Sequence, residues 1–153
     1  MISVFIPVWI IKMILRYPIF EQPICLITSL GHPLANRKSI NLNETLKYNQ
    51  ISFSKNADLY YEIQRLFSLC GGTPRISYSV EEDEAVSGLV AAGFGIAVVP
   101  KMRILKTLPI SIIPINFPKF HRFMYMAVLK KHYQSSASQK LIDFISKNVS
   151  MRL

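Results

Sequence analysis

Residues 51–100 decide the fold, and they read ISFSKNADLYYEIQRLFSLCGGTPRISYSVEEDEAVSGLVAAGFGIAVVP. Ile51-Ser52-Phe53 is expected to form a strand, and the continuous apolar run at 96–99 is expected to be a fully buried strand. Between them, Leu59, Ile63, Leu66 and Phe67 follow the spacing of an amphipathic helix over 58–69, and Gly71-Gly72 ends it. Strands that alternate with helices predict an α/β fold with a largely parallel sheet.

A second helix is expected after the strand that ends at Val80. Ser79 and Glu82 have the spacing of a capping box at its start, and Gly93 stands where it would stop. The acids at 81–84 would then fall in the first turn, where the helix dipole favours negative charge. Adjacent helical residues point in different directions, so this cluster is not predicted to bind a metal ion.

The flanking segments supply the remaining expected elements. A buried strand is expected at 22–30, and Asn43 is expected to cap a short helix that reaches Tyr48. Pro109–Pro118 suggests an edge strand or connector, and Phe123–Leu129 suggests another strand. A last helix should begin at a second capping box, Ser136–Gln139, and bury Leu141, Ile142, Ile145 and Val149.

The composition narrows the class of protein. The 153 residues include 18 basic and 9 acidic ones, half are hydrophobic, and 18% are charged. Such a chain can bury a core as one domain or two small lobes, without disulfides or metals. The cysteines, Cys25 and Cys70, fit no disulfide or zinc pattern, and we expect two buried thiols in a reducing cytosol.

The net charge of +9 favours anionic partners. The cations are scattered, however, and no nucleic-acid-binding motif accompanies them, so sequence-specific DNA reading is not predicted. The apolar stretch Met1–Leu15 contains Pro7 and Lys12, and its cations follow the apolar run instead of preceding it. It is therefore expected to be buried strand or core, not a signal peptide or membrane span.

No enzymatic chemistry, cofactor or metal site is predicted. Gly93-Phe94-Gly95 follows a helix and precedes a strand, which is the reverse of a dinucleotide-binding loop. His32, His121 and His132 lie far apart in the chain, and no serine has the surroundings of a nucleophile elbow.

A binding site is suggested by the expected topology. Small ligands bind open α/β sheets at the carboxyl ends of strands, where helix N-termini point. Two places qualify. The first consists of Ser52, Phe53, Ser54, Lys55 and Asn56, and the second consists of Val80, Glu81 and Glu82. Lys55, the hydroxyls and the free amides of the first place could hold a carboxylate, although an ordinary capped loop fits the same pattern.

An ordered set of motifs resembles the effector-binding domain of LysR-type transcriptional regulators. The most specific is the block from Gly88 to Pro100, with Ser79–Glu82 before it. Four further motifs occur in the same order as in that family: His32–Ala35, Gly72–Ile76, Arg122–Ala127 and Leu141–Ile145. The similarity extends from about Ser3 to Ile145.

This resemblance implies a fold like that of periplasmic binding proteins, with two α/β lobes joined by crossing strands. Residues 23–118 would form one complete lobe, and residues 1–22 and 119–153 a partial second one. The family's DNA-binding helix-turn-helix, its linker helix and the opening strands of the partial lobe would be absent, so no DNA binding is expected of this chain. Its partners would be a small effector, and either further copies or a full-length paralogous regulator.

The resemblance also implies where the effector binds. The interlobe cleft would be lined by Ser54, Lys55 and Asn56. Its floor would be formed by Phe5, Ile6 and Pro7, and its mouth would lie near Val80–Glu82. The sequence thus predicts a cytoplasmic, non-enzymatic effector-binding portion that senses a small anionic metabolite. A stand-alone solute-binding protein, a basic nucleic-acid-binding fragment and a non-functional truncated remnant are the alternatives.

Overall fold

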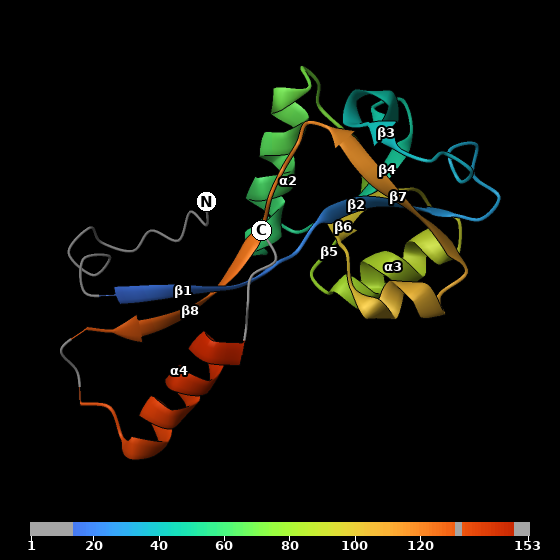
Figure 1. Cartoon of the computed structure of the whole chain (residues 1–153). Coiled ribbons are helices and arrows are strands. Elements are labelled where there is room, and N and C mark those ends of the chain that lie inside the picture. Colours follow the sequence, from blue (N-terminus) through green and yellow to red (C-terminus); the bar gives the residue numbers. More distant parts are fainter. Residues whose placement is uncertain (1–13, 131–132, 149–153) are drawn as a thin grey trace. The chain divides into compact units, whose positions relative to one another are not determined.

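The computed structural model describes residues 14–130 and 133–148, and it divides into two compact units (Figure 1). The larger unit is Pro23–Phe120. The smaller unit contains the described residues on either side of it, up to Gln22 and from His121 onward.

A mixed sheet forms the frame of the larger unit. Four strands lie in the order β3-β7-β2-β6, and β4 and β5 form a parallel pair. These strands are β2 (Ile24–Ser29), β3 (Ile40–Asn41), β4 (Asn49–Phe53), β5 (Arg75–Val80), β6 (Ala97–Pro100) and β7 (Ile110–Phe117). A parallel bridge between Gln50 and Ile96 joins β4 to the end of the four-stranded sheet at β6. Since β2 is antiparallel to both of its neighbours and the other pairs are parallel, only β2 runs against the rest.

Two α-helices pack on this frame. The helix α2 (Asp58–Leu69) has the predicted bounds, and Ile63, Leu66 and Phe67 are buried along its inner face. The helix α3 (Asp83–Ala91) contacts β2, β4 and β6. Gly71 and Gly93, which follow the two helices, have φ angles of 76° and 84°. Both glycines thus end a helix in the left-handed conformation, as predicted.

The core lies on β2, β6 and the inner helix faces. All four residues of β6 are buried, and Leu26 and Ile27 in β2 have no exposed surface. Continuous apolar runs of this kind are typical of strands that are covered on both faces. The predicted buried strands at 22–30 and 96–99 are confirmed.

The predicted capping box of Ser79 and Glu82 is wrong. β5 extends through Val80, and α3 begins at Asp83 with Glu82 at the N-cap. Ser79 pairs with Ser52 of β4, so strand pairing keeps it extended where a helix cap was expected. Asp83 lies in the first turn, as the charge pattern indicated.

The predicted cap of the short helix is also wrong. A 3-10 helix, η1 (Leu42–Thr45), begins after Asn41, not after Asn43. The Glu44 carboxylate accepts a hydrogen bond from the Asn41 N–H at 3.1 Å. Asn41 is also the last residue of β3, so pairing with β7 sets where the helix starts. A second 3-10 helix, η2, spans Arg103–Thr107.

The segment expected to be an edge strand or connector is an interior strand. β7 lies between β3 and β2, and Pro114 pairs with Cys25 of β2. On its other side, β3 pairs with β7 only at Ile115 and Phe117. Much of that side of β7 therefore has no strand partner, and positions without a ladder hydrogen bond are where strands tolerate proline.

The smaller unit contains an antiparallel ribbon and a helix. The ribbon pairs β1 (Ile14–Glu21) with β8 (Phe123–Leu129), and β8 has the predicted bounds. The helix α4 (Ser136–Asn148) is capped by Ser135, one residue before the predicted box. The Ser135 Oγ accepts the Ser138 N–H at 3.2 Å, and its carbonyl accepts the Gln139 N–H at 2.9 Å.

The predicted buried face of α4 is only partly buried. Leu141 is 58% exposed, whereas Ile142 and Ile145 are half-buried. Val149 lies outside the described residues. The described part of this unit offers α4 only a two-stranded ribbon, which is too small to cover a whole apolar helix face.

His32 lies in the turn after β2 and should make stability depend on pH. Its Nδ1 accepts the Leu34 N–H at 3.2 Å, and burial lowers the pKa of its imidazole. The unfolded chain therefore binds this proton more readily than the folded one, so stability falls as the pH falls below the unfolded pKa of about 6.5. We expect the urea midpoint to decrease between about pH 7.5 and about pH 5.5.

The matched variant is His32→Asn, because an asparagine oxygen can accept the same backbone N–H. Its midpoint should change less over the same pH range. An equal change in wild type and variant would show that other groups cause the dependence.

Candidate functional site

The loop between β4 and α2 contains the first predicted binding place. It runs from Ser54 to Ala57, and the Ala57 N–H donates to the Ser54 carbonyl at 3.0 Å. The Ser54 N–H donates to the Val80 carbonyl at 2.8 Å. The start of this loop is thus fixed against the end of the neighbouring strand.

The turn between β5 and α3 contains the second place, and the structure brings the two together. Phe53 and Val80 are register partners, so the two strands end side by side. Beyond them, the Glu81 Oε1 accepts hydrogen bonds from the Ser54 Oγ at 3.4 Å and the Asn56 Nδ2 at 3.3 Å. We call Ser54, Asn56 and Glu81 the loop triad.

Two helix N-termini adjoin the loop triad. The N-cap residues of α2 and α3 are Ala57 and Glu82, and neither makes a side-chain hydrogen bond to its helix. The first N–H groups of a helix lack intrahelical partners and carry partial positive charge. The first-turn amides that form no bond within the helix can therefore donate to an anion at the carboxyl ends of β4 and β5, whereas the Tyr60 N–H already donates to the Ala57 carbonyl.

Lys55 gives the loop between β4 and α2 a full positive charge. Its side chain is exposed between Ser54 and Asn56, and it makes no ion pair with any residue that the structure describes. A cation beside two helix starts, which forms no ion pair among the described side chains, suits the carboxylate of a small ligand.

The other predicted site residues have different positions. The Phe53 side chain is only 2% exposed and belongs to the core, so it can offer a ligand no side-chain contact. The half-buried Ser52 hydroxyl donates to the Phe53 carbonyl at 3.1 Å. Phe5, Ile6 and Pro7 lie outside the described residues.

Cysteine and metal chemistry find no support in the described part of the chain. Burial raises the pKa of the Cys25 thiol to about 12, and its Sγ donates to the Val99 carbonyl at 3.6 Å. This thiol therefore stays protonated and structural. Within residues 14–130 and 133–148, no three His, Cys, Asp or Glu side chains gather as a metal site.

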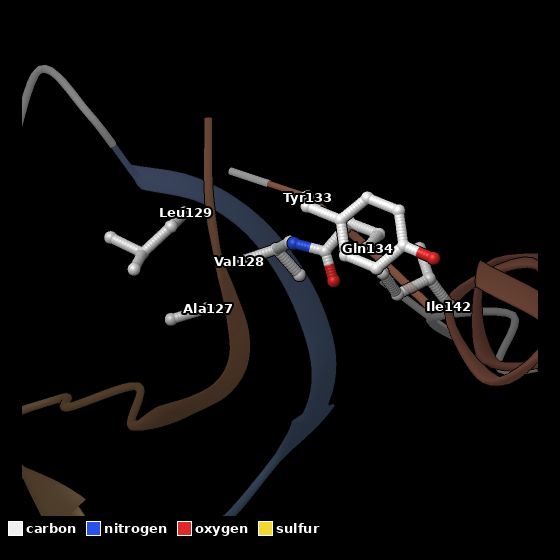
Figure 2. A pocket seen from close by; sticks show the side chains of 6 residues that line it. All are labelled: Ala127, Val128, Leu129, Tyr133, Gln134 and Ile142. Carbon is white, nitrogen blue, oxygen red and sulfur yellow. The ribbon is translucent and has the colours of Figure 1, made fainter. Parts of the chain in front are cut away.

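An open hollow of about 360 Å³ lies in the smaller unit, where the sequence had suggested none (Figure 2). Figure 2 shows that its side chains come from the end of β8, from the segment before α4 and from α4 itself. Its lining residues are Ala127, Val128, Leu129, Tyr133, Gln134 and Ile142. None of these six described side chains is charged, so they offer an anionic metabolite no counter-ion.

The family model for the LysR substrate binding domain matches residues 14–150. The chain belongs to this LysR substrate-binding domain family. The family and the periplasmic-binding-protein-like fold predicted from the motifs are confirmed.

Transcriptional regulators are among the relatives of this LysR domain. The HTH-type regulator YybE of Bacillus subtilis is 30% identical over 78% of this chain and 41% of its own length. The dual regulator GltC of the same organism is 26% identical over 83% of this chain and 43% of its own length. The LysR domain thus spans less than half the length of these two relatives.

A solved structure is similar over almost the whole LysR domain. It is the effector binding domain of QuiR in complex with shikimate, with 37% identity and a TM-score of 0.83. The match covers 90% of this chain and 66% of that one. Among the residues that the structure describes, no helix has the length and apolarity needed to cross a membrane.

Proposed function

We propose that this chain is the effector-sensing portion of a LysR-type transcriptional regulator and binds a small anionic metabolite. The observation that supports this most is the pairing of Phe53 with Val80, which places two uncapped helix starts beside one another. Lys55 adds a full positive charge at the same edge. The proposed ligand residues are those of the two loops, together with Phe5, Ile6 and Pro7.

The proposed mechanism is a change of lobe angle on binding. Residues 23–118 would be one lobe, and residues 1–22 and 119–153 would belong to the other. A ligand that contacts both lobes favours the conformation in which both contacts are made. In a homo-oligomer, or an assembly with a full-length paralogous regulator, this change would alter how the subunits are arranged and so carry the signal.

Shikimate is the first ligand to test. It is the molecule bound to the QuiR effector domain, which is 37% identical to this chain. It carries one carboxylate and several ring hydroxyls, which match a site that offers a cation, amide donors and hydroxyl groups. The proposal includes a cytoplasmic location, no enzymatic activity and no cofactor.

We expect calorimetric titration of the purified chain with shikimate to give saturable heat. Lys55→Met should weaken binding about tenfold, because a hydrogen bond to a charged group contributes about 1.5–3 kcal/mol. Lys106→Met is the control, since it removes one exposed charge from η2 without touching either loop. Equal affinities of these two variants would exclude Lys55 as the ligand's counter-ion.

If neither shikimate nor any other small carboxylate gives heat with the wild-type chain, this chain is not an effector sensor.

A further inference from the structure

The loop triad already contains an acid where an anionic ligand is expected. Ser54 and Asn56 are the side-chain donors on either side of Lys55, and both donate to one oxygen of Glu81. A ligand that used these donors would therefore meet the Glu81 carboxylate.

Glu81 restricts which chemical group can enter this position. An ionised carboxylate only accepts hydrogen bonds, so a ligand carboxylate beside Glu81 would gain no bond from it and would be repelled. A ligand hydroxyl can donate to Glu81 while it accepts from Ser54 or Asn56. The triad is thus complementary to a hydroxyl, and Lys55 with the helix amides remains available for a carboxylate.

We infer that Glu81 is a specificity-determining residue, which makes the site select hydroxylated acids over acids without hydroxyls. The inference rests on the proposed function of the same site and narrows its ligand class.

The triad is not needed to hold the loops in place. Its two hydrogen bonds are long, and Asn56 and Glu81 are exposed, so they contribute little to stability. The backbone bond from Ser54 to Val80 and the pairing of β4 with β5 already fix the loops. Glu81→Gln should therefore fold like the wild type, which makes its ligand preference interpretable.

The experiment compares shikimate with benzoate, a six-membered ring acid without hydroxyls. Calorimetric titrations of the wild-type chain should show tighter binding of shikimate. In Glu81→Gln, shikimate should bind about tenfold more weakly, because a charged acceptor is replaced by a neutral one. Benzoate should bind equally or more tightly, so the ratio of the two affinities falls tenfold or more. Glu84→Gln, the same charge change in the first turn of α3, should leave the ratio unchanged.

The outcomes separate the two proposals. An unchanged ratio in Glu81→Gln, with binding intact and the unfolding midpoint equal to wild type, would overturn the role of Glu81 and leave the sensor function standing. A ratio that falls equally in Glu84→Gln would also overturn it, because net charge alone would then explain the preference. If the wild-type chain binds neither acid, the inference fails together with shikimate as the ligand, while other carboxylates still test the sensor function.

Discussion

Replacing Phe53 with alanine is expected to lower the free energy of unfolding by about 3–5 kcal/mol, the usual cost of removing a buried phenylalanine. Phe53 is the last residue of β4 and is 2% exposed. It belongs to the same buried cluster as Ile51, Phe67 and Val90. Truncation removes most of its apolar surface from the core and leaves a cavity that the surrounding strands and helices can fill only in part.

Phe94→Ala is the matched control in the same unit. Phe94 is 49% exposed and contacts Tyr78 edge-on, with ring centroids 5.6 Å apart. Its truncation should cost about 1 kcal/mol, the range of an aromatic pair. Urea unfolding of both variants measures the difference. A cost for Phe53→Ala as small as that for Phe94→Ala would mean that Phe53 is not a core residue and would reopen its predicted contact with a ligand.

Elements whose signals are local could be predicted from the sequence. The 58–69 helix has a strong apolar period and a following glycine pair, and its observed bounds agree. The buried strand before Pro100 is a continuous apolar run that needs no partner to be identified. In each case the residues that define the element lie within that element or directly after it, so composition and spacing are sufficient to predict it.

Elements that depend on pairing could not be predicted. Ser79 has the spacing of a helix cap, but its pairing with Ser52 keeps it in β5. Pro114 suggested an edge strand, but β7 pairs with β2 on one side and with β3 on the other, and both partners lie far away in the chain. The reversed direction of β2 likewise depends on neighbours that come much later in the chain. Long-range hydrogen bonds of this kind leave no local pattern.

In the candidate site, too, the features with local signals could be predicted and those that depend on strand pairing could not. The sequence located both loops, because strand ends and helix starts have recognisable residues. That Glu81 accepts from Ser54, 27 residues earlier, follows from the β4–β5 register and could not be inferred from spacing. The burial of Phe53 did have a signal, because Ile51 and Phe53 alternate with Ser52 as in a strand with one buried face.

Gly95→Ala is expected to destabilise the chain by about 1–3 kcal/mol, the range for overpacking a well-packed site. A Cβ at this position would lie 2.7 Å from the Asn49 carbonyl oxygen and 3.5 Å from the Ile51 side chain. That carbonyl accepts the Ile96 N–H at 3.0 Å, and the Ile51 N–H donates to the Ile96 carbonyl at 2.8 Å. The new methyl would thus collide with the backbone that joins β4 to β6, and backbone atoms cannot move aside as a flexible side chain can.

Gly88→Ala separates this collision from the general effect of adding a methyl group. Gly88 lies in α3 and is exposed, and a Cβ there would meet no atom within 4 Å beyond its chain neighbours and the nearby backbone of its own helix. Alanine is favoured over glycine inside a helix by about 0.8–1.0 kcal/mol, so this variant should be more stable than the wild type. Urea midpoints should therefore shift in opposite directions for the two variants. An unchanged or raised midpoint in Gly95→Ala would show that the close approach of Gly95 to Asn49 does not limit the residue at this position, and that β4 and β6 can separate at little cost.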